Sequence, residues 1–176
     1  MLAHGRCAGF TPVALGIWSR RKGQGWSSNP IWTQLWRRPG PRGCAGLRGE
    51  VPVGAVIVHA GQIVARAGNR TQELCDPTAH AEVLAIRAAC LAAGSERLIG
   101  HDLYVTLEPC PICAGTIAAA RIARLYYGAA DPKSGGVAHG ARVFSHPQCH
   151  HAPEVYDGIN AGAAGALLKD FFAARR

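Results

Sequence analysis

The chain has 176 residues, of which 48% are hydrophobic and 17% charged, a composition typical of one globular domain and not of a disordered or fibrous chain. No apolar run reaches the ~18 residues that a membrane-spanning helix needs. Seven cysteines cannot form a fully paired disulfide framework. These features favour a reducing, cytoplasmic location with no membrane partner.

The net charge of +8 is concentrated in one part of the sequence. Residues 1–49 contain eight Lys or Arg and no Asp or Glu, whereas residues 50–176 contain eleven basic and eleven acidic residues. The high isoelectric point therefore does not by itself indicate a nucleic-acid-binding surface on the larger part, and any such surface must be argued from placed residues.

Residues 1–49 also differ in composition, with nine Gly, four Pro, all four Trp and no sustained helical period. We therefore divide the chain into this atypical basic segment, residues 1–49, which we expect to be disordered or mistranslated, and one ordered domain over residues 50–176. Three interpretations of the segment stay open: an Arg-rich targeting sequence, a basic RNA-binding arm, or a wrong-frame start joined to a real gene.

The ordered part shows alternating strand and helix patterns. In chain order the predicted elements are a strand at 51–58, a strand at 62–68, a helix at 78–93, a strand at 101–108, a helix at 111–122, a strand at 123–129, a loop at 131–141 and a helix at 161–174. Gly94 is the expected stop of the first helix, and Pro111 suits the first turn of the second. This order predicts an α/β fold, with a mixed sheet and helices packed on its faces.

Two short motifs, "HAE" from His80 and "PCPIC" from Pro109, combine the residue types of a zinc site. Cys110 and Cys113 stand three apart at a helix start, so they share a face and both sulfurs can reach one ion. His80 can supply a third ligand from the start of the other helix. Three protein ligands leave a fourth position open, which is typical of a catalytic zinc site and not of a structural one.

Glu82 is predicted to act as a proton shuttle beside the metal and not as a ligand. Residues two apart diverge by roughly 200° around an ideal helix, so His80 and Glu82 converge only if the metal lies off the helix end. Taken alone, a Cys-x-x-Cys pair is more often a redox pair or part of a structural zinc site than a catalytic one, and a histidine in an apolar run is commonly a core residue.

Together these motifs resemble the cytidine/deoxycytidylate deaminase superfamily, and the sequence is similar to the tRNA-specific adenosine deaminases within it. The phrases that carry the resemblance are "EVPVGAVIV", "GNR", "DPTAHAE", "LYVTLEPCPICAG", "RIARLYYGAADPKSG" and "LLKDFFAARR". They extend over essentially all of residues 50–176, so the resemblance implies that this part is a zinc-dependent deaminase domain. The resemblance implies a three-layer cytidine-deaminase-like fold, with a mixed central sheet and helices on both faces.

The resemblance also implies the chemistry. One Zn²⁺ per subunit would be held by His80, Cys110 and Cys113, with Glu82 as general acid and base. The implied reaction is the hydrolytic deamination of adenosine to inosine at the wobble position of an arginine tRNA anticodon, on a base flipped out of an unpaired loop. A homodimer whose two subunits both contact the tRNA is implied as well.

Substrate contacts are implied at four places in the sequence. They involve Asn69, the backbone N–H groups of Ala81 and Cys110, Asp131 and Lys133 of the loop, and Phe172, Arg175 and Arg176 near the end of the last helix. The side chains among them have plainer interpretations, as a turn former, solvated loop residues, a core aromatic side chain or a cationic helix end.

Two features depart from the resemblance. A Gly/Pro-rich run ending at Gly49 stands where the family has an amphipathic first helix, and the "HPQCHH" cluster at 146–151 offers further metal-binding side chains although the family has no second zinc there. Three alternatives therefore stay open: a zinc deaminase of a free base or nucleotide (cytosine, guanine or dCMP), a structural zinc or RNA-binding module without activity, and a damaged product that does not fold.

Overall fold

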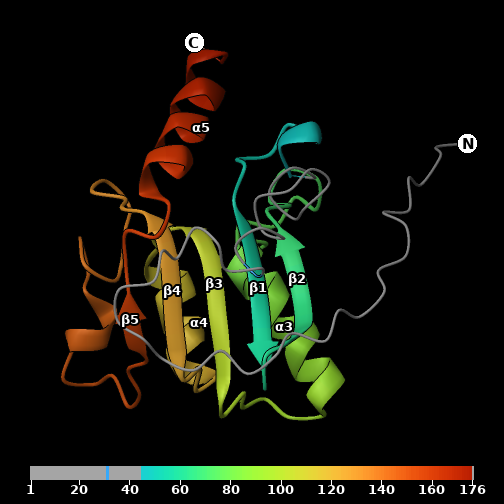
Figure 1. Ribbon diagram of the computed structural model, residues 1–176, viewed down its shortest axis with the longest axis vertical. Helices are drawn as coiled ribbons and strands as arrows, with labels where there is room; N and C mark the ends of the chain where they lie inside the picture. Colours follow the sequence, from blue (N-terminus) through green and yellow to red (C-terminus); the bar gives the residue numbers. More distant parts are fainter. Residues whose placement is uncertain (1–30, 32–44, 176) are drawn as a thin grey trace, which may run out of the picture.

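The computed structural model describes residue 31 and residues 45–175, which form a five-stranded mixed sheet with helices packed against it (Figure 1). The elements are β1 (Gly54–His59), β2 (Gln62–Gly68), α3 (Ala81–Ala93), β3 (His101–Leu107), α4 (Pro111–Ala119), β4 (Arg124–Ala129), the 3-10 helix η2 (Val143–Ser145), β5 (Glu154–Tyr156) and α5 (Ala161–Ala173). The predicted α/β class with a mixed central sheet is confirmed.

The strand order across the sheet is β2-β1-β3-β4-β5. Strand β1 is antiparallel to both β2 and β3, whereas β3, β4 and β5 run parallel to one another. A parallel pair needs a crossover connection, which α4 supplies between β3 and β4. Strands β2 and β3 run in the same direction, because both are antiparallel to β1. Helices α3 and α4 follow these two strands, so both begin at the end of the sheet where β3 ends.

Helices α3 and α4 cover one face of the sheet, behind the strands in Figure 1. Their apolar side chains pack on the side chains of β1, β3 and β4 that point to this face. The opposite face carries a stack of three tyrosines, Tyr104, Tyr126 and Tyr156, whose neighbouring ring centroids lie 4.4 and 4.7 Å apart. Ile159 packs on this second face just before α5 begins, and α5 then extends beyond the end of the sheet (Figure 1).

Several element boundaries differ from the predictions for local reasons. Helix α3 begins at Ala81 and not at Thr78, because the Asp76 carboxylate accepts hydrogen bonds from both the backbone N–H and the hydroxyl of Thr78. This side-chain turn competes with a helical turn. Strand β5, at three residues, and η2 were not predicted, since such short elements show no periodicity.

The proposed division between residues 49 and 50 stays a prediction, because most of residues 1–49 lies outside the described part of the chain. The three interpretations of that segment likewise concern residues that are not described. Residues 45–49 do contact the domain: Ala45 is fully buried and its carbonyl accepts a hydrogen bond from the N–H of Glu50. Among the described helices, none is long and apolar enough to cross a membrane.

Candidate metal centre

Two helix N-termini bring the predicted zinc ligands together. His80 is the extended N-cap residue of α3, and Cys110 is the extended N-cap residue of α4. Pro111 opens α4, where its fixed φ suits the first turn and its missing N–H costs nothing. Cys113 follows one turn later and is fully buried. The histidine and the two cysteines therefore meet off the ends of both helices, as the His80–Glu82 spacing predicted.

The distances within this cluster fit a tetrahedral zinc ion. The His80 Nδ1 atom lies 3.5 Å from Cys110 Sγ and 3.3 Å from Cys113 Sγ, and the three ligand atoms lie within 4.8 Å of one another. Ordinary zinc–sulfur and zinc–nitrogen bonds at tetrahedral angles would separate nitrogen from sulfur by roughly 3.5 Å. Among the described residues, no other group of three or more His, Cys, Asp or Glu side chains converges in this way.

Hydrogen bonds within the cluster set its protonation. A hydrogen bond with Cys113 is the main cause that lowers the pKa of Cys110 to about 4, and the same contact raises the pKa of Cys113. Contact with the Cys110 sulfur raises the pKa of His80. The site thus already favours one thiolate. A divalent cation would displace the remaining protons, because cysteine and histidine bind metals in their deprotonated forms.

Glu82 is the second residue of α3, and only 4% of it is exposed. Burial raises its pKa, whereas nearby His80 and a hydrogen bond with Cys113 act in the opposite direction. These neighbours place the carboxylate beside the metal cluster and not on the far side of the helix. Burial makes Glu82 able to take up a proton, and a bound cation would oppose that shift.

Asn69 is 7% exposed and lies at the end of β2. Its Nδ2 atom donates to Glu50 Oε2 and to Thr71 Oγ1, both at 3.3 Å. The next residue, Arg70, donates its N–H to the carbonyl of Ala79, one residue before His80. The structure therefore fixes the Asn69 amide on the chain segment that adjoins the metal cluster, and its contact with substrate stays a prediction.

The other implied substrate residues lie at the same end of the sheet or in α5. Ala81 is the first residue of α3, where backbone N–H groups have no partner within the helix. Asp131 accepts hydrogen bonds from the backbone N–H groups of Lys133 and Ser134, and Lys133 is exposed. The turn-forming interpretation of Asp131 is thus part of the structure, and its RNA contact stays a prediction.

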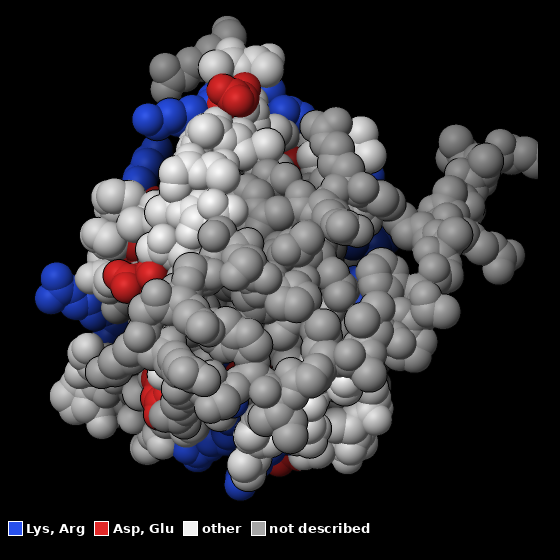
Figure 2. All heavy atoms as spheres, in the orientation of Figure 1, with Lys and Arg blue, Asp and Glu red and all other residues white. Residues whose placement is uncertain are grey.

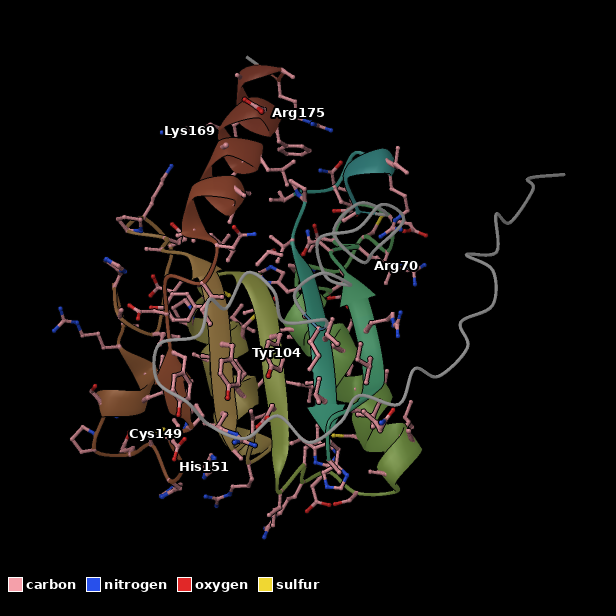
Figure 3. All side chains as sticks on the ribbon, in the orientation of Figure 1. Arg70, Tyr104, Cys149, His151, Lys169 and Arg175 are labelled. Carbon is pink, nitrogen blue, oxygen red and sulfur yellow. The ribbon has the colours of Figure 1, made fainter. Side chains whose placement is uncertain are left out.

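Helix α5 rises beyond the end of the sheet (Figure 1), and Lys and Arg side chains lie on either side of this part of the molecule (Figure 2). Phe172 is 51% exposed. Arg175 lies 3.8 Å above the ring centroid of Phe171 and donates to the carbonyl of Gly49 at 2.8 Å, so it extends from α5 toward the turn before β1 (Figure 3). Arg176 lies outside the described residues.

The "HPQCHH" cluster lies at the opposite end of the molecule from Arg175, as the positions of Cys149 and His151 show (Figure 3). The Cys149 thiol donates to the carbonyl of His151, and His151 Nε2 lies 2.6 Å from the carbonyl of Ile122. These side chains bond to the backbone and do not converge on one point. A hollow of about 560 Å³ beside them is lined by Arg97, Arg121 and side chains of α4.

Two buried glutamates near the site were not singled out from the sequence. Glu50 precedes β1 and Glu108 follows β3, and they are 0% and 2% exposed. Each carboxylate accepts hydrogen bonds from the backbone of a loop beside the metal cluster. The available signal was a glutamate directly adjoining an apolar strand, a position where a buried charge requires several hydrogen-bond donors.

The comparisons with known proteins agree with this geometry. Residues 44–129 match the family model of the cytidine and deoxycytidylate deaminase zinc-binding region. The chain is 59% identical over 132 residues to a tRNA-specific adenosine deaminase of Agrobacterium fabrum, which covers 75% of this chain and 87% of that protein. It is 43% identical over 125 residues to a protein of the same name from Bacillus subtilis, covering 71% of this chain and 78% of that protein.

Solved structures show the same similarity. A structure from a study of A-to-I editing by tRNA deaminases at the wobble position of transfer RNA is 58% identical, with a TM-score of 0.71 over 72% of this chain and 92% of that chain. A guanine deaminase from Nitrosomonas europaea has a TM-score of 0.70 at 19% identity, over 93% of this chain and 88% of that chain. At that identity the second likeness concerns the fold alone.

Proposed function

This chain belongs to the tRNA-specific adenosine deaminases of the cytidine and deoxycytidylate deaminase family, and from this premise we propose that it converts the wobble adenosine of an arginine tRNA anticodon to inosine. The observation that carries the proposal is the convergence of His80, Cys110 and Cys113 at two helix N-termini, with the Glu82 carboxylate buried beside them. The resident metal of this family region is zinc.

His80, Cys110 and Cys113 would hold the zinc ion, which when bound acts as a Lewis acid and makes water nucleophilic at neutral pH. Glu82 takes a proton from the attacking water and delivers it to N1 of the adenine ring. It then assists proton transfer to the departing amine, so that adenosine and water give inosine and ammonia. The buried position of Glu82 suits this role, because burial raises its pKa and so makes the carboxylate a better proton acceptor.

The remaining proposed contacts position the substrate. The Asn69 amide lies at the nucleoside, and the N–H groups of Ala81 and Cys110 face charge that develops at the reacting centre. Asp131, Lys133, Phe172 and Arg175 contact the anticodon loop, where a base that is already unpaired costs less to extrude. We also propose a homodimer and a cytoplasmic location, as the sequence resemblance implies.

The test uses an arginine tRNA anticodon stem-loop with adenosine at the wobble position. Purified wild-type protein is expected to produce inosine, detected by mass spectrometry of the nucleosides, and Glu82→Gln is expected to lose about 100-fold or more in kcat because no side chain remains to move the proton. Glu96→Gln is the matched control. It removes an exposed carboxylate that follows α3, and it is expected to leave kcat unchanged.

Two results would contradict the proposal. One is inosine formation at wild-type rate by Glu82→Gln, which would remove Glu82 from the mechanism. The other is a folded protein with one zinc per chain that leaves the stem-loop unchanged but deaminates free guanine, cytosine or dCMP. That result would instead support the alternative function, a zinc-dependent deaminase of a free base or nucleotide.

A further inference from the structure

A buried carboxylate that the proposed chemistry does not use lies two residues before Cys110. Glu108 follows the last residue of β3, and its side chain is fully buried. Its two oxygens accept five hydrogen bonds from one loop. The donors are the backbone N–H groups of Asp131 (3.0 Å), Val137 (3.2 Å), Ala138 (2.9 Å) and His139 (3.0 Å), and the ring Nδ1 of His139 (2.7 Å).

These bonds come from both ends of the segment 131–139, which we call the rim loop. The Asp131 N–H bonds one oxygen of Glu108, and the three consecutive N–H groups at 137–139 bond the other. The Glu108 carboxylate therefore links the two ends of the rim loop. The same loop carries Asp131 and Lys133, which are proposed above to contact RNA.

The rim loop also packs closely against the turn at residues 109–111, which contains the metal ligand Cys110. The Gly136 N–H donates to the carbonyl of Pro109 at 2.8 Å. A Cβ atom at Gly136 would lie 2.6 Å from the backbone nitrogen of Pro111, and one at Gly135 would lie 2.5 Å from Glu108 Oε1. Because no side chain fits at either position, the loop lies as close to the turn around Cys110 as glycine allows.

We propose that Glu108 is a positioning residue that seats the rim loop against the Cys110 turn, and so orders the RNA-facing edge of the site before substrate binds. The role in RNA binding rests on the proposed function, whereas the seating of the loop does not. Glu108 acts through Asp131 and Lys133 and does not itself touch the reacting atoms.

A glutamine at this position would test why a carboxylate is needed. A carboxylate offers only acceptor sites, about four in number, and so suits a cluster made entirely of donors. The amide of glutamine has the same shape, but its NH₂ group would face backbone N–H groups that need an acceptor. Glu108→Gln should therefore release part of the rim loop while removing little volume from the core.

The first experiment measures amide hydrogen exchange and steady-state kinetics on the zinc-loaded full chain. In Glu108→Gln, the amides of residues 137–139 are expected to exchange about tenfold faster or more, because their acceptor is lost. The KM for the stem-loop should rise about tenfold or more, with kcat within about twofold of wild type and one zinc retained per chain. The split between KM and kcat distinguishes positioning from a general loss of folded protein.

Asp102→Asn is the matched control, since Asp102 is a buried carboxylate at the other end of β3 that pairs with Arg124 at 2.7 Å. It should leave the exchange of the rim loop and the KM unchanged. Gly135→Ala is a second route to the same displacement, because its Cβ would collide with the intact Glu108 carboxylate. It should reproduce the raised KM, and His139→Ala, which removes one of the five bonds, should show a smaller rise.

The outcomes separate the inference from the proposed function. A wild-type protein that makes no inosine would refute the function, while exchange at 137–139 would still report whether Glu108 seats the loop. Unchanged exchange in Glu108→Gln would overturn the seating. Unchanged KM in both Glu108→Gln and Gly135→Ala, or loss of zinc as the main effect of either, would overturn the role at the RNA-facing edge.

Discussion

At the scale of single residues, three buried glutamates near the metal cluster have different proton chemistry. Burial raises the pKa of Glu82, and few donors oppose it. Burial alone would also raise the pKa of Glu108, but hydrogen bonds from His139, Asp131 and Ala138 lower it to about 2. A carboxylate held by so many N–H groups stays ionised and cannot carry protons near neutral pH. The number of donors around each side chain therefore separates the proton shuttle from the structural acceptor.

Glu50 resembles Glu108 in that hydrogen-bond donors lower the pKa of its buried carboxyl group. Its protonation should therefore make the free energy of unfolding depend on pH. Burial would raise the pKa of Glu50, but the N–H groups of Glu73 and Gln72 and the side chains of Thr71 and Asn69 together lower it below its ordinary value. A lowered folded-state pKa contributes stability above the unfolded-state value, and this contribution is lost as the pH falls through the folded-state pKa. Glu50→Gln should therefore reduce the free energy of unfolding by about 2 kcal/mol at about pH 7.

Urea unfolding at two pH values checks this prediction. The difference between wild type and Glu50→Gln should shrink as the pH is lowered from about 7 toward the folded-state pKa of Glu50, because the wild-type carboxyl becomes protonated there. Glu96→Gln, an exposed glutamate next to exposed Arg97, serves as the control and should change stability by less than about 0.5 kcal/mol. A difference that stays constant with pH would show that Glu50 contributes by shape and not by charge.

At the scale of elements, the site depends on how helices start and stop. The sequence predicted α3 and α4 and the glycine that ends α3, because these signals are local: an apolar period, Pro111 and Gly94. It placed the start of α3 three residues early, because the Asp76 turn replaces the first helical turn. Because His80 is the N-cap residue of α3, it can meet the cysteines at the start of α4.

Two glycine substitutions should change stability in opposite directions. Gly94 ends α3 in the left-handed conformation, with φ of 62° and no heavy atom within 4 Å of an added Cβ. Gly94→Ala should destabilise the protein by about 1 kcal/mol, because the strain is conformational and not steric. Gly165 lies inside α5 and also has open space around an added Cβ, so Gly165→Ala should stabilise by about 0.5–1 kcal/mol. Thermal and urea unfolding measure both, and shifts of the same sign would contradict the prediction.

At the scale of the whole molecule, the parts that the sequence predicted are those set by local patterns and by the spacing of the metal motifs. The strand and helix order gave the mixed sheet, and the His and Cys motifs indicated one zinc cluster, which the structure brings together. The hydrogen bonds of Glu108 could not be predicted, because they join residues 23 to 31 positions apart through a loop without periodicity. The contact of Arg175 with Gly49, 126 positions away, depends in the same way on tertiary structure.

Removal of zinc should lower the stability of the whole domain, because the ion binds only where the two helix N-termini are folded together. At a free zinc concentration about 1,000 times the dissociation constant, binding contributes about 4 kcal/mol, which for a chain of this size is on the order of 10 °C in Tm. A chelator should therefore lower the Tm of the wild-type protein by about that amount, measured by circular dichroism with zinc content determined in parallel.

Two cysteine variants show whether this effect belongs to the proposed site. Cys113→Ser should bind less than one zinc per chain and show a low Tm that chelation does not lower further, because one of the three ligands is lost. Cys149→Ser changes a cysteine of the "HPQCHH" cluster, whose thiol bonds the His151 carbonyl, and it should keep one zinc and the full response to chelator. Loss of zinc from Cys149→Ser, or an unchanged chelator response in Cys113→Ser, would place the metal outside the cluster of His80, Cys110 and Cys113.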